Sequence, residues 1–195
     1  YAGDRGIVYA GEISGSGSQN IIEYFDITSG GNTTDFGDLT SARKYPGTSG
    51  GSNSTKGVIP GGDGASGTID KITIATTGNA QDFGDLLNAA YSGVSAMNDG
   101  TYSVLSPASG SSFTFAAVIQ YITVATDGNA TDFGDPTYNR GVTATWSDGT
   151  RGVMMGGVDQ GASDWKDIID YITIASTGNA TDFGDLASAQ RFLGS

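Results

Sequence analysis

Gly178-Asn-Ala-Thr-Asp-Phe-Gly-Asp185 is the stretch of sequence on which the fold of this chain depends. Variants of it occur at 31–38, 78–85 and 128–135, so the core Asp-Phe-Gly-Asp begins at residues 35, 82, 132 and 182. Self-similarity at a period of 47–50 residues indicates a repeat architecture. Short β-rich runs at such a period predict the blades of a propeller.

The repeated core is predicted to serve the fold, because every copy carries it. Its aspartates would accept bonds from nearby backbone N–H groups in a turn, its glycine would take a positive φ, and its phenylalanine would pack between blades. Asp-Phe-Gly also binds metal in protein kinases, but the other kinase motifs do not accompany it here. The residues given this structural role are Asp35, Phe36, Gly37, Asp38, Asp82, Phe83, Gly84, Asp85, Asp132, Phe133, Gly134, Asp135, Asp182, Phe183, Gly184 and Asp185.

Each repeat is predicted to hold four strands and no helix, because apolar residues show no helical period. Asp-Gly turns at 99–100 and 148–149 predict hairpins, so 142–146 should pair with 151–155. Ile-rich runs such as 119–124 and the segment 131–133 supply the other strands. A Gly/Ser loop is expected at 12–20, and Trp146, on a hairpin strand, is expected in the core.

The whole chain, 1–195, is predicted to be one repeat domain with four blades. The repeat cores are 20–39, 68–86, 118–136 and 168–186. The chain starts at the second strand of a blade and stops after a first strand. Pairing of 5–11 with 188–195 would therefore complete one blade and remove free sheet edges. Alternatively, the four repeats are part of a longer array.

The repeats resemble the kelch repeat. The resemblance rests on the glycine pairs at 61–62 and 156–157, on the tyrosines at 24, 121 and 171, and on Arg43, Arg140 and Arg191 opening the following strand. Phenylalanine stands where kelch usually has tryptophan. The sequence of 171–186 also looks like that of the kelch-like arrays in bacteriophage tail-fibre and other virion proteins. This resemblance implies an all-β, kelch-like β-propeller.

The composition excludes several kinds of chemistry. The chain has no cysteine and no histidine, which rules out disulfides, thiolate nucleophiles, a Ser-His-Asp triad and His-ligated metals. No metal or other cofactor is therefore expected, although calcium on oxygen ligands stays an alternative. A net charge of −12 disfavours nucleic acid and anionic membranes, and no apolar run is long enough to cross a bilayer.

Candidate functional residues are those that the repeat does not explain. They lie in the loops between the second and third strands of the third and fourth repeats. Aromatic rings beside polar groups on a loop commonly stack a sugar or anchor a protein partner. These candidates are Phe113, Phe115, Gln160, Asp164, Trp165 and Lys166. Alternatively, the aromatic ones cap the core. The tyrosines at 45, 91 and 138 could line the mouth of a channel.

These observations predict a non-enzymatic adhesion or decoration module of a phage virion, which presents its loops to a host-surface glycan or protein. Its partners would be other virion or fibre subunits, with a homo-oligomer as one arrangement, and its location the virion or the extracellular space. One alternative is a purely structural subunit. Another is a glycan-cleaving enzyme, which would need two unrepeated carboxylates in one pocket.

Overall fold

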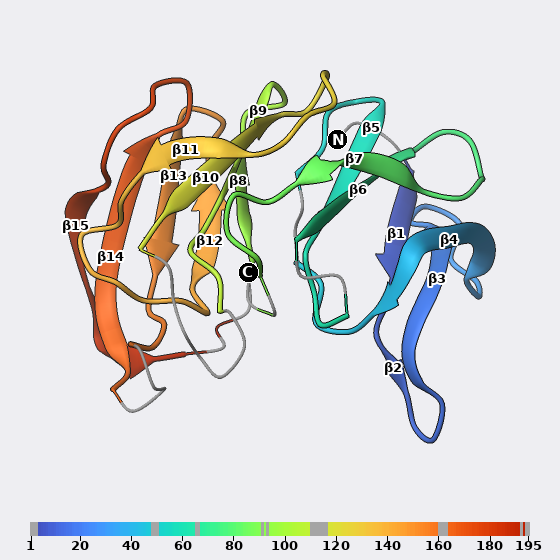
Figure 1. Cartoon of the computed structure of the whole chain (residues 1–195), viewed down its shortest axis with the longest axis horizontal. Helices are drawn as coiled ribbons and strands as arrows, with labels where there is room; N and C mark the ends of the chain where they lie inside the picture. Colours follow the sequence, from blue (N-terminus) through green and yellow to red (C-terminus); the bar gives the residue numbers. More distant parts are fainter. Residues whose placement is uncertain are drawn as a thin grey trace.

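Four antiparallel sheets of three or four strands build the chain in a computed structural model that describes residues 4–47, 51–64, 67–90, 92, 94–109, 117–159, 164–191 and 193. The described residues contain no helix (Figure 1). Each sheet is built from one sequence repeat and follows the preceding one around an arc. This β-propeller-like arrangement confirms the predicted all-β class.

Sheet 1 consists of β1 (Arg5–Tyr9), β3 (Gly17–Asp26) and β4 (Thr34–Arg43), with β2 (Glu12–Ile13) against the start of β3. The prediction of a loop at 12–20 was wrong. Glu12 pairs with Ser18 and Ile13 with Gly17, so this segment is a hairpin. Its turn uses glycines at positive φ, at Gly15 and Gly17, which is why a Gly/Ser-rich stretch suits it.

The other sheets repeat the same strand order. Sheet 2 has three strands. Sheets 3 and 4 each have a fourth strand, which comes first in the chain and forms a hairpin with the next strand. The strands are β5 (Lys56–Pro60), β6 (Thr68–Thr73) and β7 (Gln81–Asp85) in sheet 2; β8 (Ala96–Asn98), β9 (Tyr102–Leu105), β10 (Ile119–Thr123) and β11 (Thr131–Gly134) in sheet 3; and β12 (Ala144–Ser147), β13 (Arg151–Met155), β14 (Lys166–Thr173) and β15 (Thr181–Gln190) in sheet 4.

The Asp-Gly hairpin predicted in the fourth repeat is confirmed. Ala144 pairs with Met155 and Ser147 with Gly152. The Asp148 carboxylate closes the turn by accepting hydrogen bonds from the Thr150 and Arg151 N–H groups at 2.8 and 2.7 Å. These bonds lower the pKa of Asp148.

The Asp-Phe-Gly-Asp segments lie in strands, with Asp135 directly after β11, which confirms the strand predicted at 131–133; the turn that was also expected there is absent from these described segments. In all four sheets the pairing register shifts beside this segment, as at Ile169/Asp170. The segment is therefore a bulged strand. The expected positive φ of its glycine is confirmed, from +136° at Gly184 to +147° at Gly84 and Gly134. The expected side-chain bond is present at Asp182, whose carboxylate accepts the Gly184 N–H at 3.0 Å.

A repeated set of hydrogen bonds joins each sheet to the next, and we call it the intersheet lock. Between sheets 3 and 4, the Gly178 N–H donates to the Phe133 carbonyl at 2.7 Å and the Ala180 N–H donates to the Asp135 carbonyl at 2.8 Å. The Asn179 side-chain oxygen accepts the Asp135 N–H at 3.1 Å. The same three bonds join sheets 1 and 2 through 78–80, and sheets 2 and 3 through 128–130.

The bulge glycine lets the lock close. A Cβ placed on Gly37, Gly84 or Gly134 would lie 2.4–2.5 Å from backbone atoms of the glycine that opens the next repeat's turn. The two backbones therefore approach too closely for any side chain. At Gly184, against which no described sheet packs, a Cβ would meet nothing within 4 Å.

The apolar core fills the spaces between consecutive sheets. Phe133 of sheet 3, for example, packs in one cluster with Met154, Ile172 and Ile174 of sheet 4. Phe36 and Phe83 occupy the same place in the two earlier junctions. The prediction that the repeated phenylalanine packs between sheets is confirmed for these three. It fails for Phe183, which is 54% exposed because no sheet of the described residues covers it.

Buried ion pairs reinforce two of the three junctions. The Arg140 guanidinium lies 2.9 Å from the Asp170 carboxylate, and Arg43 lies 2.9 Å from Asp70. All four side chains are buried. Arg191 had been grouped with Arg43 and Arg140, but their equivalent position, five residues after the repeat's last aspartate, is Gln190 in sheet 4.

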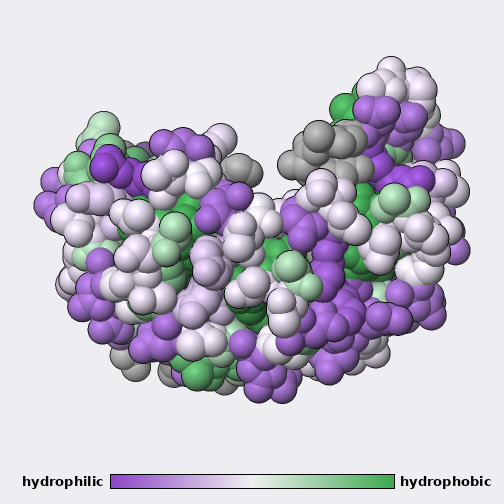
Figure 2. Space-filling model, turned by 90° about the horizontal axis from the view of Figure 1, so that it is seen from above, coloured by the Kyte–Doolittle hydropathy of each residue, from purple (hydrophilic) through white to green (hydrophobic). Residues whose placement is uncertain are grey.

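The arc leaves one side of the molecule open. Seen from above, the surface is hollowed between the part formed by sheet 4 and the part formed by sheet 1 (Figure 2). β1 is an edge strand that pairs with β3, and β15 pairs with β14. Among the described residues no strand pair joins 5–11 to 188–191, so the expected closure of a four-bladed ring stays a prediction.

Candidate ligand-binding surface

Three of the predicted site residues lie together at the start of β14. Asp164, Trp165 and Lys166 follow one another there, at one end of an interior strand of sheet 4. Gln160, Phe113 and Phe115 fall outside the described residues. With Tyr138, Asp159 and Arg191, the first three form a group that we call the Trp165 cluster.

Backbone pairing fixes the position of the cluster. Trp165 bridges Val158, which in turn bridges Gly141. The Asp159 N–H donates to the Asp164 carbonyl, and the Asp164 N–H donates to the Asp159 carboxylate, each at 3.0 Å. The two ends of the variable loop are thus held together, and the residues at its base are attached to a regular sheet.

Lys166 is the charged centre of the cluster. Its ammonium donates a hydrogen bond to the Asp164 carboxylate and lies 3.9 Å from Asp159. It also lies 4.6 Å from the centre of the Tyr138 ring. The hydrogen bond to Asp164 raises the pKa of Lys166, and burial opposes that rise. The ammonium therefore stays charged and holds both carboxylates in place.

Trp165 and Tyr138 present exposed rings beside these charges. Trp165 is half exposed, and the Arg191 guanidinium lies 5.1 Å from its ring centre. An aromatic ring with a cation over one face keeps a fixed orientation and leaves the rest of its surface to a ligand. The cluster therefore combines apolar stacking surface with donors and acceptors that are already oriented, which are features of sites that bind sugars or protein side chains.

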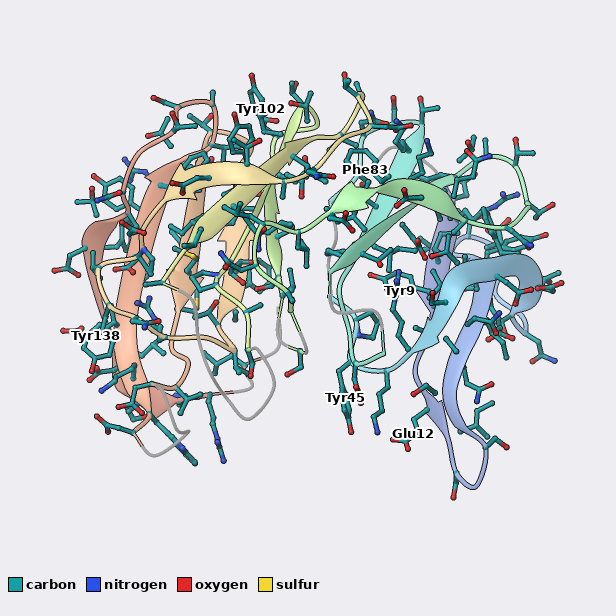
Figure 3. The ribbon with its side chains drawn as sticks, viewed as in Figure 1. Tyr9, Glu12, Tyr45, Phe83, Tyr102 and Tyr138 are labelled. Carbon is teal, nitrogen blue, oxygen red and sulfur yellow. The ribbon has the colours of Figure 1, made fainter. Side chains whose placement is uncertain are left out.

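A second group of similar composition lies on sheet 1. The Lys44 ammonium lies 5.5 Å from the Tyr45 ring centre, 3.8 Å from Glu12 and 3.6 Å from Asp63. Tyr45 is exposed and has φ +53°, which is uncommon for a non-glycine residue. Figure 3 shows Tyr45, Glu12 and Tyr138 toward the lower end of the molecule, whereas Tyr102 lies at the upper end. The sequence had singled out Tyr45 and Tyr138, and it had also named Tyr91, which falls outside the described residues.

Two further features lie between sheets at the upper end. A cavity of about 250 Å³ is lined by Tyr102, Tyr121, Phe133 and residues 174–177. In the preceding junction, Lys56 crosses the equivalent gap and donates to the Ala125 carbonyl at 3.1 Å. Lys56 and Lys71 both bind the Asp127 carboxylate, and the hydrogen bonds from Lys71 and Lys56 lower the pKa of Asp127.

Trp146 was expected in the core, and this prediction was wrong. Its side chain is 57% exposed on β12. Its equivalent in sheet 3 is Met97, which is fully buried against sheet 4. The residue type is that of an intersheet core position, but no described sheet packs on this face of sheet 4.

Within the described part of the chain, no group of three or more acidic residues is placed to hold a metal ion, and no helix could cross a membrane. Asp159 and Asp164, two acids that the repeat does not explain, both lie in ion pairs with Lys166. A comparison with models of known protein families finds no match, and a comparison with curated proteins finds no relative.

Proposed function

We propose that this chain is a non-enzymatic adhesion module, built as a kelch-like propeller, that binds a surface glycan or protein through the Trp165 cluster. The observation that carries the proposal is that the sheets and their junctions are repeated, whereas the Trp165 cluster is not. The intersheet lock recurs at every junction, whereas Trp165, Lys166 and Asp164 occur once, with Trp165 and Asp164 exposed and Lys166 half-buried between them. Variable residues on a constant scaffold are the usual arrangement of binding proteins.

The setting of this module is part of the proposal. The sequence of 171–186 resembles kelch-like arrays of phage virions. If the chain is part of a tail fibre or decoration protein, it is located on a virion or outside the cell. Closure into four blades by pairing 5–11 with 188–195 is a finer expectation. It would fill the unpaired edge of β1, which lines an apolar cavity of about 340 Å³ together with sheets 2 and 3.

The test is binding of the isolated 195-residue chain to a glycan array and to intact host cells. Trp165→Ala and Tyr138→Ala are each expected to weaken binding at least tenfold, as truncation of an aromatic anchor does. Leu87→Ala is the matched control, because Leu87 is equally exposed on sheet 2 and should leave binding unchanged. Undiminished binding by both aromatic variants would place the site elsewhere.

A purely structural virion subunit is the second candidate. The observation in its favour is that both ends of the arc expose apolar side chains of the kind that is buried at internal junctions. A chain that binds no glycan and no cell, yet assembles with other subunits, would support this candidate and contradict adhesion.

A further inference from the structure

The face of sheet 4 that points away from sheet 3 has the composition of an intersheet contact surface, but no described sheet packs on it. Trp146, Val153, Ile169 and Phe183 occupy the positions that Met97, Val104, Ile119 and Phe133 hold in sheet 3. The sheet 3 residues are all buried against sheet 4. In sheet 4, Trp146 is 57% exposed and Phe183 54%. An exposed apolar patch of this kind marks a contact site.

The face of sheet 1 that points away from sheet 2 has the features of the other half of such a junction. Val8 is 49% exposed and Ile27 61%, whereas their equivalents in sheet 4, Met154 and Ile174, are buried in the junction with sheet 3. The glycine–asparagine turn of the lock is also present, at Gly31 and Asn32. Within the described residues, neither Gly31 nor Asn32 makes the lock bonds that its equivalents make in the later sheets.

We propose that these two faces join head to tail, so that sheet 4 of one copy packs on sheet 1 of a second copy. The internal junctions define the contact. The N–H groups of Gly31 and Thr33 of one copy would donate to the Phe183 and Asp185 carbonyls of the other, and the Asn32 side chain would accept the Asp185 N–H. Trp146 and Phe183 would cover Val8, Phe25 and Ile27.

We assign a second copy to this face because each copy exposes the apolar side chains and the Gly-Asn turn from which the internal junctions are built. Closure of one chain into four blades would bury the same two faces, so it is the competing arrangement, and it would leave a monomer. In the structure the open side of the arc lies between sheets 4 and 1 (Figure 2). Gly184 has the positive φ of the other bulge glycines and open space above it, so a second backbone can approach there. The contact joins two different surfaces, so the copies close into a ring if the rotation between them closes and form an open filament if it does not.

The experiment measures the mass of the 195-residue chain in solution over a range of concentrations. We expect species of at least twice the 19.8 kDa chain. Phe183→Asp and Ile27→Asp each place a charge on one face, and each variant alone should be monomeric. A mixture of the two should regain a two-chain species, because it retains one intact pair of faces. Both residues are exposed, so both variants should fold, which circular dichroism checks.

Ile13→Asp is the matched control, because Ile13 is as exposed as Val8 but lies on β2, and it should assemble like the unchanged chain. Asn32→Ala should weaken association about five- to tenfold, as expected for one hydrogen bond. A chain that stays monomeric at its highest soluble concentration overturns the proposal. Association that survives both aspartate variants also overturns it.

Discussion

The four copies of the repeat phenylalanine show how position in the arc changes the contribution of one side chain. Phe133 is buried between sheets 3 and 4, whereas Phe183 has the same strand neighbours but no following sheet. Each ring packs edge to face on a tyrosine of its own sheet, with centres 5.9 Å apart for Phe133 and Tyr121 and 5.8 Å for Phe183 and Tyr171. The difference between them is therefore the contact across the junction.

Phe133→Ala is expected to lower the free energy of unfolding by about 3–5 kcal/mol, as other buried phenylalanine truncations do. Phe183→Ala should cost less than half as much, because its ring already contacts water. Urea titration of both variants as monomers measures the two values. Equal losses would show that the strand, and not the junction, determines the contribution of this residue.

Tyr9 supplies a pH-dependent contribution to stability. Its hydroxyl donates to the Gly47 carbonyl at 2.8 Å, and burial of that hydroxyl raises its pKa to about 12, a rise that Arg43 partly offsets. Because the folded pKa exceeds the ordinary value near 10, the contribution is complete below pH 10. It is lost as the pH rises toward 12.

The expected result is that the free energy of unfolding falls between pH 10 and 12, and falls less in Tyr9→Phe. Denaturant titrations at several pH values on both proteins measure the difference between them, which cancels the titration of the other tyrosines and the lysines. Parallel pH profiles would mean that the Tyr9 hydroxyl is accessible to water in the folded state.

At the scale of elements, the junctions between sheets use two alternative polar designs. Sheets 3 and 4 are joined by Asp170, which accepts bonds from Arg140 and Thr137. In the junction of sheets 2 and 3, the equivalents of Thr137, Arg140 and Asp170 are Leu87, Ala90 and Gln120, and the Gln120 side chain accepts the Leu87 N–H at 2.7 Å. Charge appears on both partners or on neither, since a buried charge without its partner is costly.

Asp170→Ala is therefore expected to destabilise the chain by about 3–5 kcal/mol, because it leaves the Arg140 guanidinium buried and unpaired. The triple variant Thr137→Leu, Arg140→Ala and Asp170→Gln copies the other junction and should recover at least half of that loss. Chemical unfolding of the two variants decides the matter. A triple variant no more stable than Asp170→Ala would mean that the junctions are not interchangeable.

At the scale of the whole molecule, the net charge of −12 opposes every contact between copies. The proposed head-to-tail faces are largely apolar, so their attraction does not depend on salt, whereas the repulsion between two acidic molecules does. Association should therefore become tighter as salt rises from about 10 to 200 mM. Sedimentation at the two salt concentrations tests this. Weaker association at high salt would indicate an ionic contact in place of the apolar one.

The sequence by itself determined the repeat, the strand content and the hairpins. Period and turn chemistry are local properties: Asp148 and Gly149 form a tight turn whatever lies around them. The sequence also pointed to Trp165 and Lys166, because a residue that breaks a repeat is visible without coordinates. The loop expected at 12–20 failed for the same local reason, since glycine and serine suit both a loop and a hairpin turn.

Only the tertiary structure decided which equivalent residues are buried. Trp146 has the side chain of a core position and Phe183 that of a junction, yet both are exposed, because burial depends on the sheet that lies opposite and not on the residue. The pairing of Arg140 with Asp170, thirty positions apart in sequence, likewise follows from the packing of two sheets. Contacts between repeats arise from how the sheets are placed in space, and a single repeat does not encode that placement.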